Sequence, residues 1–303
     1  MVAFAHGPMD WPSASLIPGG GPCLTGAIMS HSTLTSTLAS SDEERAGRWS
    51  GRNADKDRLR AEIWGNLETS GVNIGPVWSR ISNWVGAEVA AKRLSELDIW
   101  KRAKVVKCNP DPPQIPVRLR ALYDGKLLYM PVPEFGTGEL PWVLLDPARL
   151  ERDGVQFELA ATSQGAVSVG QKLGFEEMMP LDIAVCGCVA VTRSGGRTGK
   201  GGGFADLELG LFRDLAKITD ATPIVTTVHS SMVVDDDRLP IMPHDSLLNW
   251  IVTEKDVIET YPTGRQPGGV RWDLVQPDQL EDIWFLKDLK ARILAGKSGQ
   301  PPR

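Results

Sequence analysis

A near-continuous apolar run at residues 181–191, "LDIAVCGCVAV", constrains the fold of this chain more than any other feature. Such a run is typical of a strand in a parallel sheet, because that strand is buried on both faces. A glycine-rich loop follows at residues 194–203, then a segment with helical apolar spacing at 204–218, and then a second apolar run, "TPIVTTVH". Strand, loop, helix and strand at these lengths predict βαβ units and therefore an α/β fold.

Further elements are predicted on both sides of this unit. Apolar spacing indicates helices at residues 54–68 and 87–101, and short strands at residues 103–109 and within "LNWIVTEKDVI". The stretch 117–133 fits two interpretations. It forms either a hairpin that turns at Asp124 and Gly125, or a helix that leads through Gly125 into a strand at residues 126–130.

The two ends of the chain differ in composition from its middle. Residues 1 to about 50 are rich in Gly, Pro, Ser and Thr, a composition that cannot bury enough apolar area to order itself. We therefore expect a disordered leader at 1–50, an α/β domain at 51–290 and a flexible tail at 291–303.

Charge and hydropathy argue against several functional classes. The 303 residues include 33 basic and 38 acidic side chains, a formal net charge of −5, whereas binders of nucleic acids or membrane surfaces usually carry a basic excess. No apolar stretch approaches the roughly 18 residues of a membrane span. The four cysteines lack the spacing of a zinc set, and we interpret them as small buried thiols of a protein in a reducing cytoplasm.

The segment 194–206, "SGGRTGKGGGFAD", carries the strongest sign of chemistry. Glycine adopts positive φ angles and lets the backbone approach a ligand, so successive amides can point toward one anion. The loop opens a predicted helix, whose N-terminus also favours an anion. Arg197 and Lys200 complete a predicted phosphate cradle, and Asp206 follows in the first helical turn, where a carboxylate could hold phosphate-bound Mg²⁺.

This loop differs from the two commonest nucleotide motifs. It is not a Walker A loop, because Lys200 is followed by Gly201 and not by Ser or Thr. It also lacks the spacing of a Rossmann fingerprint. A glycine-rich surface loop without a ligand is the alternative interpretation.

Lys56 and Arg60 form the second unusual feature. On a helix that begins near Asn53, both cations fall in the middle of the stripe that Leu59 and Ile63 define. Cations in such a position either extend to the edge of the apolar surface or bind an anion.

Together these segments resemble the 5-formyltetrahydrofolate cyclo-ligase family, also called methenyltetrahydrofolate synthetases. "GRTGKGGGFAD" is similar to the family's R-x-G-x-G-x-G-Y-Y-D loop, "KDRLR" to its K-x-x-L-R segment, "GKLLYMP" to its Gly-Lys strand, and "LPIMPHDSLLNWIVTE" to its L-P-x-x-x-H-D stretch. "VKCNPDPPQIPVR", "ATSQG" and "PIVTTVH" are similar to its divergent, domain-containing branch. The resemblance covers roughly residues 53–260 and implies a three-layer α/β/α fold with a mostly parallel sheet, of the ribose-5-phosphate isomerase/CoA-transferase-like type.

The resemblance implies a ligase that uses ATP and Mg²⁺ to convert 5-formyltetrahydrofolate to 5,10-methenyltetrahydrofolate. In the implied mechanism the formyl oxygen attacks the γ-phosphate, and the neighbouring amine of the folate then closes the ring. Arg197 and Lys200 are the implied catalytic residues. The implied partners are ATP and a reduced folate, and we expect a cytoplasmic monomer that binds neither membranes nor nucleic acids.

The resemblance also assigns the binding residues. It assigns ATP to Lys56, Arg60, Arg197, Thr198, Gly199, Lys200, Gly201, Gly202, Gly203 and Phe204, the folate to Asp111 and Phe204, and Mg²⁺ to Asp206, Asp245 and Asn249. Phe204 and Ala205 replace the family's Tyr-Tyr pair. Asn249 stands where members often have a second Mg²⁺ aspartate, and Asp245, four residues earlier, is the alternative ligand.

Three other functions remain open. Asn249 and Ala205 favour a non-catalytic regulatory protein that retains a nucleotide or folate pocket. An RNA-associated protein is suggested by the divergent branch, although the residues after Tyr261 show no aromatic RNP-like pattern. A sugar-phosphate isomerase would rest on analogy of fold alone.

Overall fold

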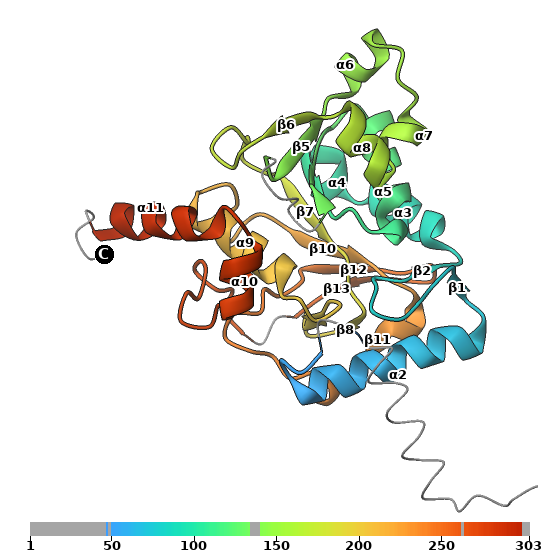
Figure 1. Ribbon diagram of the computed structural model, residues 1–303. Coiled ribbons are helices and arrows are strands. Elements are labelled where there is room, and N and C mark those ends of the chain that lie inside the picture. Colours follow the sequence, from blue (N-terminus) through green and yellow to red (C-terminus); the bar gives the residue numbers. More distant parts are fainter. Residues whose placement is uncertain (1–46, 48–49, 134–139, 262–263, 299–303) are drawn as a thin grey trace, which may run out of the picture. The chain divides into compact units, whose positions relative to one another are not determined.

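Figure 1 shows the computed structural model of the chain, which describes residues 47, 50–133, 140–261 and 264–298. The chain divides into two compact units, residues 1–40 and 41–303, and every described residue belongs to the second. Apart from Gly47 and Ser50, the predicted leader lies outside the described residues.

A large sheet forms the centre of the second unit. Its strands are β3 (Val105–Cys108), β4 (Leu127–Pro131), β5 (Trp142–Leu145), β6 (Gln171–Leu173), β7 (Ile183–Cys186), β10 (Ile224–Thr227), β12 (Trp250–Val252) and β13 (Val257–Glu259). Their order is β13-β12-β10-β7-β3-β4-β5-β6. The strands from β12 to β4 in this order are all parallel. The three outer strands are antiparallel to their neighbours: β13 to β12, β5 to β4, and β6 to β5.

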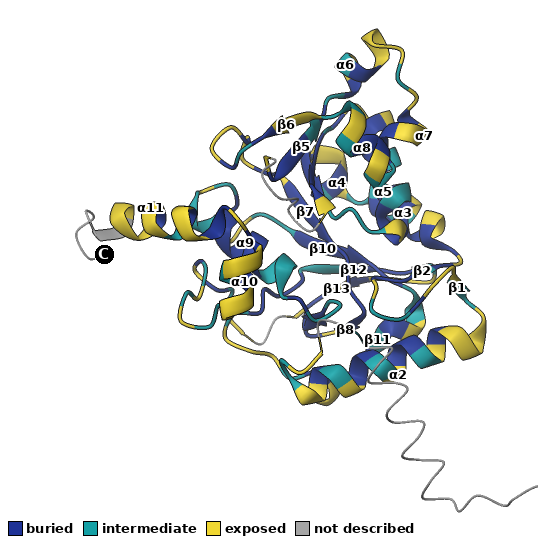
Figure 2. Ribbon diagram, viewed as in Figure 1, coloured by how far each residue is buried: buried dark blue, intermediate teal, exposed yellow. Residues whose placement is uncertain are grey.

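Helices cover both faces of this sheet. On one face, α3 (Ala87–Glu96) contacts β10 and β12, α5 (Ile115–Tyr123) contacts β3 and β4, and α8 (Ser163–Val169) contacts β5. On the other face lies α9 (Phe204–Asp214), where Phe212 packs on Trp142 with ring centroids 5.0 Å apart. Figure 2 shows that the central strands are buried on both sides. The predicted α/β class, with a mostly parallel sheet between helices, is confirmed.

The remaining elements surround this core. The other helices are α2 (Ala54–Ser70), α4 (Asp98–Arg102), α6 (Pro147–Arg152), α7 (Phe157–Ala160), α10 (Pro277–Asp282) and α11 (Leu286–Ser298). β1 (Asn73–Ile74) pairs with β2 (Asn83–Trp84), and β8 (Ala190–Thr192) lies between β9 (Arg197–Thr198) and β11 (Val233–Val234) in a small sheet. Short 3-10 turns lie at Pro112–Gln114, Ser230–Met232 and Asp236–Arg238. None of the described helices is both long and apolar enough to span a membrane.

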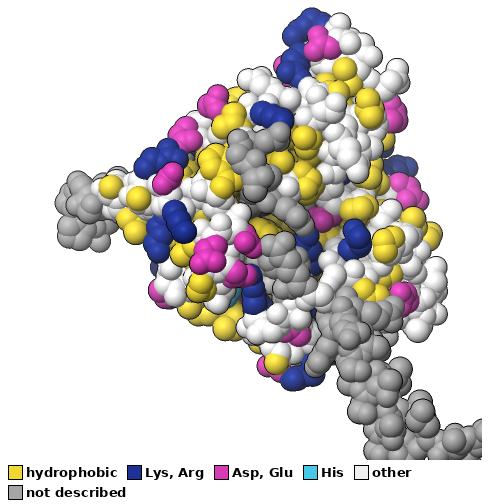
Figure 3. Space-filling model, in the orientation of Figure 1, with side chains coloured by type: hydrophobic (Ala, Val, Ile, Leu, Met, Phe, Trp, Pro, Cys, Tyr) yellow, Lys and Arg dark blue, Asp and Glu magenta, His cyan; other side chains and the backbone are white. Residues whose placement is uncertain are grey.

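The surface of the described residues carries mixed charge. On the face in Figure 3, Lys and Arg side chains are interspersed with Asp and Glu side chains. This distribution agrees with the small net charge of −5.

The apolar run at residues 181–191 is two strands, and not the single strand that its hydropathy predicts. β7 ends at Cys186, the chain turns at Gly187, and β8 begins at Ala190 in the small sheet. A Cβ atom at Gly187 would lie 2.8 Å from Oδ2 of Asp111, a distance too short for a side chain. Glycine therefore permits the turn that brings the end of β7 against Asp111.

Two further segments refine the predicted secondary structure. The helix expected at residues 87–101 is divided into α3 and α4, because Leu97 adopts an extended conformation with φ −74° and ψ 146°. For residues 117–133 the structure has the helix-then-strand arrangement, α5 followed by β4, and not the hairpin.

The C-terminal helix α11 continues through residues 291–298, the first part of the segment for which we expected a flexible tail. Its apolar residues Leu289 and Ile293 are buried, and Arg292 pairs with Glu176. Apolar burial of this kind stabilises a helix that its local sequence leaves marginal. Residues 299–303 lie outside the described residues.

Gly65 and Gly165 form a matched pair that tests the packing of the helices. A Cβ atom at Gly65, in α2, would meet nothing within 4 Å, whereas one at Gly165, in α8, would lie 1.9 Å from the carbonyl oxygen of Leu159. We expect Gly65→Ala to raise the free energy of unfolding by about 0.5–1 kcal/mol, because alanine is the better helix former. Gly165→Ala should lower it by about 1–3 kcal/mol, because the backbone must move. Urea denaturation measures both, and equal stabilities would contradict the packing of α7 against α8.

Candidate functional site

A pocket of about 240 Å³ opens at the carboxyl ends of β3, β4 and β7. The chain leaves these strands through Asn109, residues 131–133 and Gly187, all of which line the pocket. Open α/β sheets bind their ligands at this edge. The start of α2, the glycine-rich loop, the first turn of α9 and two later segments complete its walls.

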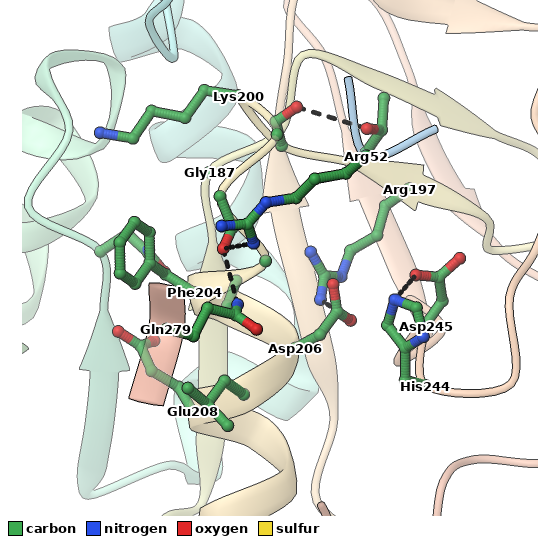
Figure 4. A pocket seen from close by; sticks show the side chains of 18 of the residues that line it. Arg52, Gly187, Arg197, Lys200, Phe204, Asp206, Glu208, His244, Asp245 and Gln279 are labelled. Carbon is green, nitrogen blue, oxygen red and sulfur yellow. Dashed lines mark hydrogen bonds and ion pairs between the residues drawn. The ribbon is translucent and has the colours of Figure 1, made fainter. Parts of the chain in front are cut away.

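The structure brings nearly all of the predicted site residues to this pocket. Its lining includes Lys56, Arg60, Asp111, Arg197, Thr198, Gly199, Lys200, Gly201, Gly202, Gly203, Phe204, Asp206 and Asp245. They come from α2, from the segment after β3, from the loop between β9 and α9, and from the segment before β12. Residues from distant parts of the sequence therefore share one concave site, as Figure 4 shows for the labelled side chains.

Asn249 is the exception, and its assignment to Mg²⁺ is corrected. It lies at the amino end of β12, where its Oδ1 accepts a hydrogen bond from the Ile224 N–H at 2.8 Å. Ile224 begins the parallel neighbour β10, so this contact lies at the edge of the sheet opposite the pocket. The Asn249 amide therefore joins two strand ends, whereas Asp245, the other predicted Mg²⁺ ligand of that segment, lines the pocket.

The glycine-rich loop presents its backbone to the pocket. Gly201 and Gly203 have φ angles of 111° and 71°, in the left-handed region that favours glycine. Gly203 is also the N-cap of α9, and no side chain caps this helix. Within the described part of the chain, no acceptor pairs with the backbone N–H groups of residues 200–203. Successive unpaired amides at a helix start are the geometry of an anion site.

Lys56 and Arg60 are both buried, with 7% and 3% of their surface exposed, and so neither extends to solvent. Lys56 Nζ lies 2.5 Å from Oδ2 of Asp245. Arg60 pairs with Asp57 and donates to the hydroxyl of Thr198 at 2.8 Å. Of the two alternatives for cations on the apolar stripe, the structure has the one in which they bind anions, here two aspartates.

Arg197 and Asp206 form the centre of the pocket. The Arg197 guanidinium pairs with Oδ1 of Asp206, which also accepts the Ser246 N–H at 2.8 Å. Burial raises the pKa of the Asp206 carboxyl; Arg197 opposes this shift, and the carboxylate of Asp245 adds to it. Oδ2 of Asp206 has no hydrogen-bond partner among the described residues, so one carboxylate oxygen is available to a ligand.

Lys200 is the lysine of this pocket that forms no ion pair with any described residue. Its side chain extends away from Arg197 and Asp206 in Figure 4. It lies on the side of Asp111, since of all neighbouring charges Lys200 does most to lower the pKa of that carboxyl. Burial outweighs this effect, and the net shift of the Asp111 pKa is upward.

Arg118, in α5, is a buried residue that sequence analysis missed. Its guanidinium donates to the carbonyl oxygens of Asn109, Pro110 and Asp111, and its Nε donates to Ala161 at 2.7 Å. It therefore fixes the segment that carries Asp111. Arg118 is the last residue of "VKCNPDPPQIPVR" and Ala161 is the first residue of "ATSQG", two segments that resemble the family. The resemblance therefore marked both residues, but no local spacing in either segment predicts that they contact each other.

Lys107 and Glu208 are a second pair that sequence analysis missed. Lys107 lies in the middle of β3 with no exposed surface, and its Nζ is 2.6 Å from Oε2 of Glu208 in α9. Nζ also donates to Oδ1 of Asn109 at 2.7 Å. Burial lowers the pKa of Lys107, but the Glu208 carboxylate and the thiols of Cys186 and Cys108 together outweigh burial, so the net shift is upward and the ammonium stays charged. The pair ties α9 to the sheet directly below the pocket.

Asp111→Asn is expected to raise the free energy of unfolding at neutral pH. Burial raises the pKa of the Asp111 carboxyl above its ordinary value of 3.8, so above that pH ionisation of this carboxyl favours the unfolded chain over the folded one. For such a group, stability is fully present below the unfolded pKa and is lost as pH rises through the folded pKa. The gain from the variant should therefore disappear below pH 3.8. Denaturation curves across pH measure it, with Asp98→Asn, at an exposed position, as the control. A gain that persists in acid would contradict this origin.

The fold and the pocket define an α/β protein with a candidate anion site at the carboxyl ends of its parallel strands. Residues 52–254 match the model of the 5-formyltetrahydrofolate cyclo-ligase family, and the chain belongs to this family. The resemblance in the sequence is thereby confirmed.

The chain is also similar to several named proteins. The chain is 34% identical over 241 residues to the methenyltetrahydrofolate synthase domain-containing protein of Homo sapiens, an alignment that covers 78% of this chain and 62% of that protein. It is 31% identical over 85 residues to a mitochondrial 5-formyltetrahydrofolate cyclo-ligase of Arabidopsis thaliana, covering 27% of this chain and 31% of that one. The NMR structure of Aquifex aeolicus 5,10-methenyltetrahydrofolate synthetase aligns with a TM-score of 0.43 and 21% identity, over 70% of this chain and 95% of that one. The chain thus spans about three fifths of the length of its human relative.

Proposed function

We propose that the protein is an ATP- and Mg²⁺-dependent ligase that converts 5-formyltetrahydrofolate to 5,10-methenyltetrahydrofolate. The observation that carries this proposal is the row of unpaired amides at residues 200–203, at the start of α9, beside the free ammonium of Lys200. A polyphosphate has the charge and the acceptor oxygens that such a site binds. Family membership supplies the reaction that uses it.

The residues of the pocket would act mainly by positioning and by charge. The formyl oxygen attacks the γ-phosphorus of ATP and ADP leaves. The neighbouring amine nitrogen of the folate then attacks the formyl carbon, loses its proton, and expels the oxygen as inorganic phosphate. The loop amides, Arg197 and Lys200 stabilise the charge on the transferred phosphoryl group, a role that needs no dedicated base. Phe204 offers its ring to the folate, and Asp111, which also lines the pocket, offers a carboxyl.

The acidic residues of the pocket fit a magnesium ion. Mg²⁺ is commonly held by one or two carboxylates together with substrate phosphates and water. Asp206 and Asp245 supply two carboxylates, and no described group of three or more His, Cys, Asp or Glu side chains could hold a metal by itself. Bound there, the ion would neutralise phosphate charge, and Asp206 would hold it through the unpaired Oδ2.

A regulatory protein that binds nucleotide or folate without turnover is the second candidate. Ala205 favours it, because this residue lines the pocket with a methyl group where the family pattern has a tyrosine hydroxyl. For either function we propose a reducing compartment such as the cytoplasm, since Cys108, Cys186 and Cys188 are buried free thiols.

The formation of product tests the proposal. Purified protein with ATP, Mg²⁺ and 5-formyltetrahydrofolate should develop the absorbance of methenyltetrahydrofolate and release equal amounts of ADP, and omission of any one component should abolish both signals. Binding of ATP and folate without product would favour the regulatory protein. Absence of binding would refute both functions.

Lys200→Ala is expected to weaken ATP binding by about 1–3 kcal/mol, as the loss of a charge-assisted contact does. The variant should unfold at nearly the same temperature, because this lysine has no ion-pair partner among the described residues. Lys104→Ala is the matched control, since Lys104 is exposed and precedes β3 at the opposite edge of the sheet. Calorimetric titration with ATP measures both, and unchanged affinity for Lys200→Ala would remove it from the site.

A further inference from the structure

The carbonyl oxygen of Gly202, in the middle of the glycine-rich loop, is held by two donors from distant parts of the chain. Nη1 of Arg52 donates to it at 2.9 Å, and Nε2 of Gln279 donates to it at 2.8 Å. Both contacts join the loop to segments that lie far away in the sequence, as the dashed lines in Figure 4 show. A loop rich in glycine has many accessible conformations, so two fixed donors on one peptide restrict it strongly.

Gln279 is itself held in one orientation. Its Oε1 accepts the backbone N–H of Gln276 at 3.0 Å, in the capping box at the start of α10. The oxygen of the amide is therefore occupied by α10, and its nitrogen faces Gly202. Arg52 is likewise fixed from the same helix, because its guanidinium pairs with Asp278. Asp278 and Gln279, which are neighbours in α10, thus fix the positions of both donors.

These contacts set the direction of the next amide. The peptide group is planar and trans, so the N–H of Gly203 points opposite to the carbonyl of Gly202, away from Gln279. Gly203 has no room for another side chain, because a Cβ atom there would lie 2.9 Å from Nε2 of Gln279. The N–H groups of residues 200–203 donate to no acceptor within the described chain, and the direction of the last of them, that of Gly203, is therefore set by the two donors behind the loop.

We propose that Gln279 and Arg52 are positioning residues that hold the glycine-rich loop in its anion-binding conformation. The proposal rests on the proposed function, because the anion is the polyphosphate of ATP. Gln279 lies beyond residues 52–254, the part that matches the family model, and Arg52 is the first residue of that part. The segment that contains α10, which also contributes Val275 and Gln276 to the pocket lining, is therefore part of the nucleotide site.

Two substitutions at one position separate this role from simple capping of α10. Gln279→Glu keeps an oxygen for the Gln276 N–H, since glutamate serves in capping boxes, but loses the donor to Gly202. Gln279→Met loses both contacts and adds no charge. Glu281→Gln, at an exposed position of the same helix, is the control. The first readout is the affinity for ATP, with inorganic tripolyphosphate as a second probe. The second readout is the rate of tryptic cleavage after Lys200 in the ligand-free protein, with cleavage after Lys255 as the internal reference.

Both Gln279 variants should bind ATP and tripolyphosphate roughly tenfold more weakly, with the KM for ATP raised and the KM for folate unchanged. Cleavage after Lys200 should become roughly tenfold faster in both, since proteolysis follows the population of the open loop. If Gln279→Glu behaves like the natural protein, Gln279 only caps α10 and the proposal is overturned. Faster cleavage with unchanged affinity for ATP also overturns it. If the natural protein binds neither probe, the proposed function fails, whereas cleavage still decides whether these residues position the loop.

Discussion

Asp206→Asn is expected to reduce the turnover of 5-formyltetrahydrofolate at least about a hundredfold, while ATP still binds in the absence of Mg²⁺. The asparagine keeps the shape of the side chain but provides only a neutral oxygen where Oδ2 of the aspartate is unpaired. It also releases the Arg197 guanidinium, whose positive charge then faces the phosphates without its partner. Magnesium titrations of activity measure the first effect, and ATP titrations with a chelator measure the second.

Asn249→Asp is the control for this prediction. Because its side chain bonds to Ile224 at the amino edge of the sheet, a carboxylate there should leave the Mg²⁺ dependence unchanged. If Asp206→Asn turns over at the rate of the natural protein, Asp206 does not hold Mg²⁺ and acts only as the ion-pair partner of Arg197. A change of Mg²⁺ dependence in Asn249→Asp would contradict the position given to this residue.

Breaking the ion pair between Lys107 and Glu208 should have the largest effect on stability. Lys107 has no exposed side-chain surface and Glu208 has 3%, so either single substitution, Lys107→Met or Glu208→Leu, leaves a charge buried without its partner. We expect each to lower the free energy of unfolding by about 3–5 kcal/mol. The double variant should recover most of this loss, because two apolar side chains replace two charges that cost much to desolvate.

Urea denaturation of the natural protein, both single variants and the double variant completes a thermodynamic cycle. Additive losses would show that the two side chains do not interact in the folded protein. Arg271→Met, which breaks an exposed pair with Asp273, is the control and should change stability by less than about 1 kcal/mol.

Local patterns predicted the class of the fold and most of the pocket. Runs of apolar residues identify buried strands, and helical spacing identified α2 and α9, because both signals lie within a few turns of chain. The glycine-rich loop was recognisable for the same reason, because its glycines, its two cations and the start of the following helix all lie within residues 194–206. Lys56 and Arg60 were conspicuous because they interrupt an apolar stripe.

Contacts between distant segments could not be predicted in this way. Hydropathy alone continues the first strand through Gly187, and only the approach of Asp111 in three dimensions explains the turn there. The carbonyl partners of Arg118 and the amide of Gln279 depend on which loops the sheet brings together. Asn249 shows a related limit: four residues after Asp245, the chain has already reached the other edge of the sheet.

The fate of the formyl oxygen tests the central claim most directly. 5-Formyltetrahydrofolate that carries a heavy oxygen isotope in its formyl group is mixed with ATP, Mg²⁺ and an excess of the protein, and the released phosphate is analysed by mass spectrometry. Attack of the formyl oxygen on the γ-phosphorus predicts methenyltetrahydrofolate together with one labelled oxygen in each phosphate. Unlabelled phosphate, or no methenyltetrahydrofolate at saturating ATP and Mg²⁺, would contradict it.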